Sequence, residues 1–312
     1  MKIFLTGGCG YIGSLLTKKL LNEGYDVTVF DTQWFGNYLK KHPKLKVIKD
    51  DIRNIKKYSL KNYNTIIHLA NIANDPGVEL NEKLSWEVNV LATQMLLDQA
   101  VKFDVKHFIY SSSGSVYGVK KEKKVTENLE LVPISAYNKT KMVAEKIVES
   151  YKDKIPAHII RPATVCGVSP RMRLDVSVNM FTFQAMEFNK MTVFGGNQIR
   201  PNIHVNDIVN VFYHFLIKPK LKIGSYNAGF ENIKILDIAK KIKKLTDAEI
   251  KITISNDQRS YRQDSSKLLK TGFKKKYSVE DAISEVRDWH KFQKNLNFNK
   301  FYTVKWMKKL GL

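Results

Sequence analysis

The N-terminal stretch MKIFLTGGCGYIGSLLTKKLLNEGYDVTVFD constrains the fold more than any other part of the sequence. Residues 3–6 form an apolar run typical of a buried strand, and Gly8, Gly10 and Gly13 follow it at G-x-G-x-x-G spacing. An amphipathic helical pattern and a second strand-like run come next, and that run ends at Asp31. This order predicts a βαβ unit whose glycine turn lets a dinucleotide pyrophosphate approach the backbone N–H groups at the start of the helix.

The acidic residue at the end of the second strand predicts which dinucleotide binds. A carboxylate at Asp31 accepts hydrogen bonds from the two hydroxyls of an adenosine ribose and repels a 2′-phosphate. The predicted cofactor is therefore NAD and not NADP. The alternative is a glycine-rich turn without a ligand, and the correct order of strand, helix, strand and acid argues against it.

Further strand-like segments alternate with helical patterns along the first half of the chain. They lie at 46–49, 65–69, 107–111 and 158–161, and the helices are predicted over 84–103 and over 135–151 with Ser135 as N-cap. The alternation predicts an α/β fold, a Rossmann-type doubly wound parallel sheet. After Pro162 the alternation loosens. We therefore predict an NAD-binding Rossmann domain over 1–165, a smaller interleaved substrate-binding part mainly over 166–290, and a basic C-terminal extension over 291–312.

The net charge of +22 is compatible with three classes of partner, namely nucleic acid, an anionic membrane or an acidic small molecule. The lysines are spread through the chain, without a zinc-finger or RNA-binding pattern, so we interpret them as a solvated surface that steers an anionic substrate and predict no nucleic-acid partner. The C-terminal extension is expected to pack back on the domain, and the alternative is a contact with a membrane surface or a partner.

The hydrophobic runs and the cysteines bear on where the protein works. No run approaches the roughly 18 apolar residues of a membrane span. The first strand follows Met1 directly, which leaves no visible signal peptide and indicates a cytoplasmic protein. Cys9 and Cys166 are the two cysteines; they suit a reducing compartment and lack the spacing of a metal site, so no metal is predicted.

Tyr137 and Lys141 are the first candidates for catalysis. They are four residues apart on a predicted helix, so their side chains emerge on the same face. A neighbouring ammonium stabilises a phenolate and lowers the tyrosine pKa towards working pH, which would let Tyr137 act as a general base. Residues 111–113, a run of three serines, follow a predicted strand at the ligand edge of the sheet, where a hydroxyl could bind the same substrate oxygen. The alternative is a serine-rich loop and a surface tyrosine.

Taken together, these motifs resemble the extended short-chain dehydrogenase/reductases that act on nucleotide sugars, the NAD-dependent epimerase/dehydratase family. The resemblance covers nearly the whole chain and rests on TGGCGYIGS at 6–14, DDIR at 50–53, HLAN at 68–71, YSSSGSVYG at 110–118, YNKTK at 137–141 and RPATVCG at 161–167. It implies NAD-dependent modification of a nucleotide-diphosphate sugar through a 4-keto intermediate, in the synthesis of cell-surface polysaccharide precursors. It also implies a homodimer formed through the two predicted helices.

The resemblance assigns roles to individual residues. The catalytic set would be Ser113, Tyr137 and Lys141. The cofactor-binding set would be Gly7, Gly10, Tyr11, Ile12, Gly13, Asp31, Asp51, Ile52, Leu69, Ala70, Ser111, Tyr137, Lys141 and Pro162. The substrate-binding set would be Ser113, Asn179, Val193, Phe194, Arg200 and Arg259. The two arginines suit a diphosphate, with a structural salt bridge as the alternative for either. His68 and His204 are interpreted as packed structural residues.

The same comparison bears on the reaction. In the 4,6-dehydratase branch an Asp-Glu pair follows the catalytic serine or threonine, and here Gly114 and Ser115 occupy those positions and cannot act as acid and base, so dehydration is disfavoured. We place C4 epimerisation slightly ahead of net C4 oxidation or reduction. The second option is raised by SPRMRLD, VNMFTFQA and RPNIHVND, which resemble a bacterial surface-polysaccharide branch that includes GDP-heptose 4-dehydrogenase. This sequence keeps the full Ser-Tyr-Lys set, and Asn71 stands where many relatives have a small residue, so the substrate of that branch is not carried over. A non-catalytic NAD-sensing or RNA-binding relative would usually lose the Tyr-Lys pair.

Overall fold

The computed structural model describes residues 1–254, 260, 262–293 and 297–312 of the chain. Its central element is a sheet of seven strands, and all neighbouring pairs in it run parallel. In spatial order the strands are β10 (Gly224–Ala228), β6 (Ala157–Pro162), β5 (His107–Ser111), β4 (Thr65–His68), β1 (Lys2–Thr6), β2 (Asp26–Asp31) and β3 (Leu45–Lys49). The predicted strands match the observed ones to within one residue at each end. The Rossmann-type prediction is confirmed.

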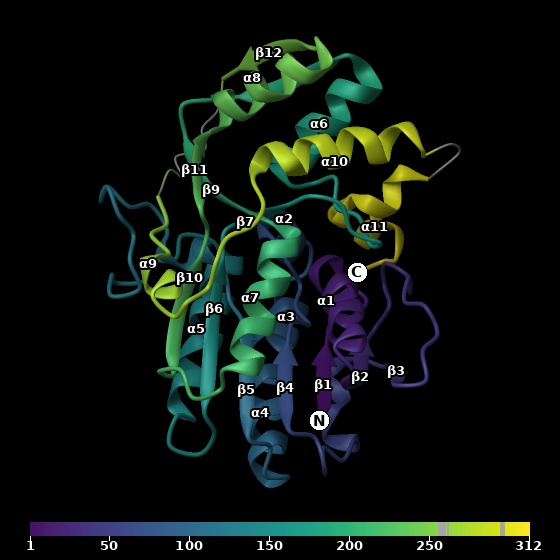
Figure 1. Ribbon diagram of the computed structural model, residues 1–312, viewed down its shortest axis with the longest axis vertical. Coiled ribbons are helices and arrows are strands. Elements are labelled where there is room, and N and C mark those ends of the chain that lie inside the picture. The colour runs from purple at the N-terminus through teal and green to yellow at the C-terminus, as the bar shows by residue number, and fades with distance from the viewer. Residues whose placement is uncertain (255–259, 261, 294–296) are drawn as a thin grey trace.

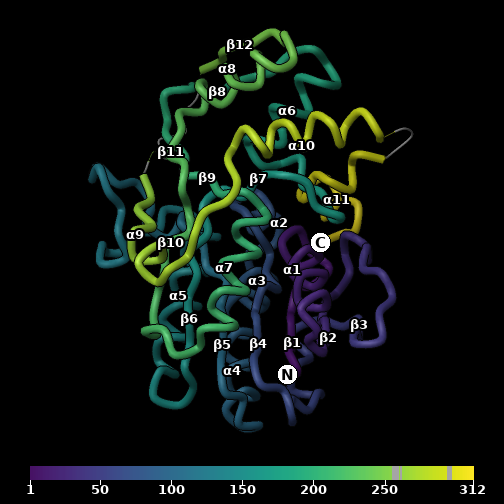
Figure 2. Tube along the Cα trace, in the orientation of Figure 1, coloured from purple at the N-terminus to yellow at the C-terminus, as the bar shows by residue number. Residues whose placement is uncertain are grey.

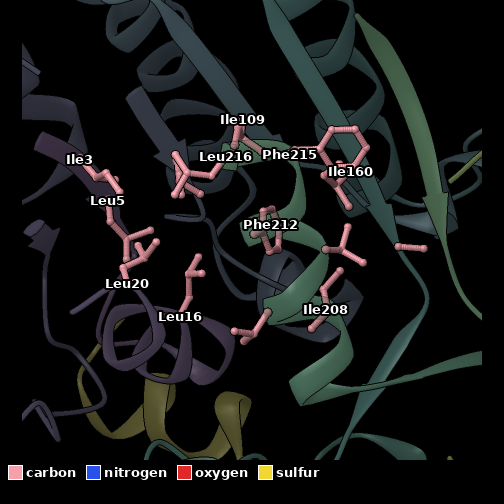
Figure 3. Close-up of a cluster of buried hydrophobic side chains, with 14 of the residues drawn as sticks. Ile3, Leu5, Leu16, Leu20, Ile109, Ile160, Ile208, Phe212, Phe215 and Leu216 are labelled. Carbon is pink, nitrogen blue, oxygen red and sulfur yellow. The ribbon is translucent and has the colours of Figure 1, made fainter. Parts of the chain in front are cut away.

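One face of the sheet is covered by α1 (Tyr11–Asn22) and α7 (Val205–Ile217), which lie side by side in Figure 1. The strands are apolar on both faces because helices cover both sides of a parallel sheet. In Figure 3 the buried side chains of the two helices meet those of the strands. The labelled examples are Leu16 and Leu20 of α1, Ile208, Phe212, Phe215 and Leu216 of α7, and Ile3, Leu5, Ile109 and Ile160 of the sheet. Each such side chain contributes about 1.5–3 kcal/mol when fully buried.

The opposite face carries α4 (Ala92–Lys102) and α5 (Ala136–Ser150), whose apolar residues pack with those of the sheet in a second cluster. The N-cap prediction for α5 is confirmed, since the Ser135 hydroxyl accepts a hydrogen bond from the Asn138 N–H at 3.2 Å. The helix predicted over 84–103 begins at α3 (Glu82–Trp86) and passes through a π-helical turn, η2 (Glu87–Leu91), before α4. Within this turn the buried amide of Asn89 binds both backbone groups of Ile72, a tertiary contact that sequence periodicity does not reveal.

The smaller part lies beyond the carboxyl ends of the strands, at the top of Figure 1. It contains a three-stranded sheet of β11 (Glu231–Lys234), β9 (Ile199–His204) and β7 (Thr164–Cys166), and a two-stranded sheet of β12 (Glu249–Thr253) and β8 (Lys190–Phe194). Its helices are α6 (Ser177–Phe188), α8 (Ile235–Thr246) and α10 (Val279–Lys291). Because α7 and β10 return to the large sheet, the two parts are interleaved as predicted.

The remaining elements are short. They are η1 (Ile52–Lys57), α2 (Asp75–Leu80), η3 (Gly114–Tyr117), α9 (Ser266–Leu269), η4 (Phe298–Phe301) and α11 (Thr303–Lys309). The C-terminal pair, η4 and α11, returns to the side of α1 and α2 (Figure 2), and Phe301 and Met307 are buried there. Residues 297–312 of the extension therefore pack back on the domain. In the part of the chain that the structure describes, no helix is both long and apolar enough to cross a membrane.

Candidate active site

A cavity of about 850 Å³ opens at the carboxyl edge of the large sheet. Its lower wall is made by the glycine turn and by the segments that follow β2, β4, β5 and β6, and its upper wall by the smaller part. Ligands of doubly wound sheets bind at this edge. The predicted catalytic residues and all of the predicted cofactor-binding residues line this one cavity.

The glycine turn is tightly packed against the rest of the sheet edge. Gly7 has a φ of +73°, and a Cβ on it would lie 2.6 Å from the backbone nitrogen of Ala70. A Cβ on Gly13 would lie 2.1 Å from the carbonyl oxygen of Gly7. Gly10 is the N-cap of α1, and no side chain caps the helix there. The turn therefore needs its glycines, and it leaves the N-terminal end of α1 available to an anion.

Asp31, the last residue of β2, closes this turn. Its carboxylate accepts hydrogen bonds from the Cys9 N–H at 2.9 Å and the Gln33 N–H at 2.7 Å. Burial raises the pKa of Asp31, and the hydrogen bonds from Gln33 and Cys9 oppose that shift. Each carboxylate oxygen carries more than one lone pair. The group can therefore hold the turn and still accept hydrogen bonds from a ligand in the cavity.

Tyr137 and Lys141 lie one turn apart on α5, and both line the cavity. Lys141 is only 3% exposed, and its Nζ donates to the carbonyl oxygen of Ser111 at 2.7 Å. The same Nζ lies 5.0 Å from the centre of the Tyr110 ring. Burial lowers the pKa of Lys141 to about 7, and the negative charge of Glu145 opposes this shift. The lysine is thus fixed in place beside the end of β5.

The adjacent serines after β5 have different partners. Ser113 is the N-cap of η3, and its hydroxyl shares a hydrogen bond of 2.8 Å with the Ser115 hydroxyl. Ser112 instead donates its hydroxyl to the buried carboxylate of Glu145. The hydroxyl of Ser112 is therefore engaged in the protein interior. Ser113, the residue expected to act on the substrate, has only a short-range partner on the cavity wall.

Sequence reasoning missed the buried network behind these serines. Glu145 lies four residues after Lys141 and forms an ion pair with Arg161, whose Nη2 is 2.6 Å from Glu145 Oε2. Arg161 Nη1 also donates to the Tyr117 hydroxyl at 2.7 Å, which in turn donates to Asn227 Oδ1 at 2.8 Å. The available signal was the spacing, since Tyr137, Lys141 and Glu145 repeat every four residues along one helix face.

The structure separates the predicted substrate-binding residues into groups. Phe194 and Arg200 line the cavity with Ser113. Val193 is fully buried in the core of the smaller part. Asn179 is also buried, and its side-chain amide binds the Gly167 N–H and the Arg173 carbonyl, each at 2.9 Å. Neither Val193 nor Asn179 is among the lining residues, and Arg259 lies outside the described residues.

His68 and His204 have the packed surroundings that the sequence indicated. His68 is buried and forms hydrogen bonds with the hydroxyls of Thr6 and Thr93. His204 is stacked on Tyr277, with its ring centre 4.7 Å away, and contacts Glu285. Neither histidine lines the cavity.

Two further arginines line the cavity and were given no role by the sequence. Arg173 forms a two-point ion pair with Asp175, with Nε and Oδ1 2.8 Å apart. Burial disfavours the charge on Asp175, but Arg173 and the hydrogen bonds outweigh it and lower the Asp175 pKa to about 2. Arg171 is 3% exposed and lies over the Phe35 ring at 4.0 Å. Both belong to the SPRMRLD stretch, whose charge and resemblance to the surface-polysaccharide branch were the available signals.

Comparison with known proteins places these features in a family. Residues 3–229 match the model of the NAD dependent epimerase/dehydratase family. The chain is 29% identical to a UDP-glucose 4-epimerase of Lactobacillus helveticus, over 93% of this chain and 97% of that protein.

Two solved structures have the same fold. A UDP-glucuronic acid 4-epimerase from Bacillus cereus in complex with NAD is 28% identical, with a TM-score of 0.83 and coverage of 93% of this chain and 96% of that one. The NDP-hexosamine 5,6-dehydratase TunA has a TM-score of 0.86, with coverage of 94% and 99%. TunA is 20% identical to the chain, so this similarity shows the fold alone.

Proposed function

The chain belongs to the NAD dependent epimerase/dehydratase family, and from this we propose that it inverts C4 of a nucleotide-diphosphate sugar through a 4-keto intermediate, using bound NAD. The observation that carries the proposal is the presence of Ser113, Tyr137 and Lys141 on the wall of the cavity that also contains the glycine turn. The product would be a precursor for cell-surface polysaccharide.

The residues present fit NAD. Gly7, Gly10 and Gly13 bring the backbone of the turn to the cavity wall without side chains of their own, and the N-terminal end of α1 suits a pyrophosphate. Asp31 suits the two hydroxyls of an adenosine ribose. The adenine would be bordered by Ile52 and by Asp51, whose carboxylate accepts a hydrogen bond from the Arg53 N–H at the start of η1. The ribose and phosphates would lie against Leu69 and Ala70. Bound NAD would supply the acceptor for a hydride from the sugar carbon and would return it.

The protein's part is proton transfer and positioning. Tyr137 removes the proton of the sugar hydroxyl and later returns it. Lys141, held by the Ser111 carbonyl, places its ammonium one helical turn from the phenol and favours the phenolate. The Ser113 hydroxyl donates a hydrogen bond to the same sugar oxygen. The 4-keto sugar rotates between the two transfers and receives the hydride on its other face, so epimerisation requires no acid beyond Tyr137.

The diphosphate and base would lie against the smaller part. Arg200, which lines the cavity, would bind the diphosphate, and Phe194, which is 56% exposed, would flank the base. Asn179, Val193 and Arg259 are retained as substrate residues on the resemblance alone. For Asn179 the contact would run through its own backbone or through a changed side-chain position, because its amide is engaged internally.

The chain's residues argue against dehydration. Gly114 and Ser115 form the start of η3, and the Ser115 hydroxyl is bound to Ser113. Neither residue can supply the carboxylic acid and base of an elimination.

Net C4 oxidation or reduction is the second candidate, because SPRMRLD, VNMFTFQA and RPNIHVND resemble the branch that includes GDP-heptose 4-dehydrogenase. A homodimer through α4 and α5 is proposed as well.

A panel of UDP-, GDP-, CDP- and dTDP-sugars tests the proposal. The purified protein is incubated with each sugar, and nicotinamide absorbance is followed together with product identity. We expect an inverted sugar without a net change in NADH. A ketosugar with stoichiometric NADH would replace epimerisation by C4 oxidation, and a dehydrated sugar would overturn the assignment of Gly114 and Ser115.

A further inference from the structure

The C-terminal segment, defined here as residues 297–312, forms part of the cavity wall. Its lining residues are Tyr302, Thr303, Val304, Lys305 and Met307. The segment lies outside residues 3–229, the part that matches the family model. This part of the cavity wall is therefore separate from the nucleotide-binding motifs at the start of the chain.

The segment is anchored on two sides of the cavity. On one side, Trp306 Nε1 donates to the carbonyl oxygen of Trp34 at 2.7 Å, in the loop that follows β2 and Asp31. On the other, the Leu174 N–H donates to the Phe301 carbonyl at 2.9 Å, and the Thr303 N–H donates to Asp175 Oδ2 at 3.2 Å. Through these bonds the segment links the loop after β2 of the large sheet to the loop that carries Arg171 and Arg173.

The helix α11 also closes a third side. It packs on α2, and Met307 is 2% exposed within the cluster that contains Ile72 and Val78. The segment consequently runs from the loop after β2 to the helix after β4. These are the two strands that flank β1 and its glycine turn in the sheet.

Arg171 lies beneath the segment and points to an anionic ligand. Its Nη2 is 3.4 Å from the Thr303 hydroxyl, and its Nε has no hydrogen-bond partner among the described residues although it is buried. Burial lowers the pKa of Arg171 to about 10. A buried guanidinium with an unsatisfied N–H is costly unless a ligand completes its hydrogen bonds. The cavity that it lines also contains the glycine turn.

We propose that the cavity-lining residues of this segment, Tyr302, Thr303, Val304, Lys305 and Met307, are part of the dinucleotide-binding site and cover bound NAD, so that the cofactor leaves only when the segment detaches. The inference rests on the proposed function for the identity of the cofactor. It also bears on the reaction, because an epimerase reuses one NAD whereas a dehydrogenase exchanges it after every turnover. A covered cofactor suits the first.

The test is the rate at which NAD dissociates from the full chain. Protein loaded with NAD is transferred to NAD-free buffer, and the retained NAD is measured over time after rapid gel filtration, without sugar. Trp306→Phe keeps an aromatic ring but removes the bond to Trp34, and Thr303→Val removes the hydroxyl facing Arg171. Lys308→Ala, on the exposed face of α11, is the matched control.

We expect Trp306→Phe and Thr303→Val to release NAD faster than the wild type, by about fivefold for the loss of one hydrogen bond, and Lys308→Ala to release it at the wild-type rate. Circular dichroism melting checks that each variant is folded. Wild-type release rates in both folded variants would overturn the inference. Faster release without any epimerised sugar would leave the inference standing and remove the proposed function, whereas a wild-type chain that binds no NAD would remove both.

Discussion

Lys141 Nζ lies 2.7 Å from the carbonyl oxygen of Ser111, which ties the helix bearing Tyr137 to the end of the strand before Ser113. This contact between α5 and β5 therefore helps to position the three residues proposed for catalysis. Glu145 extends the arrangement by a further helical turn, since it binds Ser112 on the strand side and Arg161 of β6.

Removing the charge of Glu145 is expected to destabilise the fold strongly. Glu145→Gln leaves the buried Arg161 guanidinium without its counter-charge, and the loss of one partner of a buried pair costs about 3–5 kcal/mol. The free energy of unfolding from urea titration measures this. Glu149→Gln is the control, because it removes a more exposed carboxylate of the same helix that pairs with Lys146, and about 0.5 kcal/mol or less is expected. Equal, small losses would contradict a structural role for the Glu145–Arg161 pair.

Asp31→Asn is expected to weaken NAD binding and to reduce the preference of the protein for NAD over NADP. An asparagine side chain has one oxygen that accepts hydrogen bonds instead of two, so either the Cys9 N–H or the Gln33 N–H loses its partner. The negative charge that repels a 2′-phosphate is also lost. We expect the Kd for NAD to rise by roughly tenfold, the equivalent of about 1.4 kcal/mol, and the ratio of the two Kd values to move towards one. Titration calorimetry with both dinucleotides gives this ratio. Asp26→Asn, at the exposed start of the same strand, should leave it unchanged.

Stability is expected to fall as the pH drops below about 6.5, because buried histidines remain neutral in the folded protein. Burial lowers the pKa of His68 and of His107 to about 3, and it also lowers the pKa of His158, which shares a hydrogen bond of 2.7 Å with His107. The unfolded chain takes up these protons near pH 6.5 and the folded chain does not, so stability is complete above that pH and is lost progressively below it.

Between pH 7.5 and pH 5 the loss for a histidine with a folded pKa near 3 is about 2 kcal/mol. Denaturant titrations at several pH values measure the slope of the free energy of unfolding against pH. It should become shallower in His107→Gln and remain unchanged in His42→Gln, whose side chain is exposed. An equal slope in wild type and His107→Gln would show that this histidine does not carry the effect.

The large sheet and the cofactor edge were predictable from sequence for a physical reason. Strands buried on both faces read as short continuous apolar runs, and the glycine turn must follow the first of them. Residues such as Asp31 and Ser113 then lie at strand ends, so the topology alone brings them together. The helix cap at Ser135 is similarly local, since it depends on one hydroxyl and the N–H three residues later.

Other parts of the site depend on contacts that no local pattern encodes. Arg171 and Arg173 reach the cavity because the loop before α6 folds under the C-terminal segment, and sequence gives no indication of that return. Asn179 reads as a polar residue on an apolar helix, but its partners lie on the loops that contain Gly167 and Arg173. The π-helical turn around Asn89 likewise reflects a tertiary hydrogen bond to Ile72.

The central claim is that Tyr137 transfers the proton at C4 of a nucleotide sugar. The most direct measurement compares the rate of C4 inversion, followed by NMR of the product sugar, in wild type, Tyr137→Phe and Tyr151→Phe. The last variant alters a tyrosine at the far end of the same helix, bound to Asp98. We predict a loss of about 10²–10⁴-fold in kcat for Tyr137→Phe, with NAD binding intact, and wild-type turnover for Tyr151→Phe. Undiminished inversion by Tyr137→Phe would contradict the account.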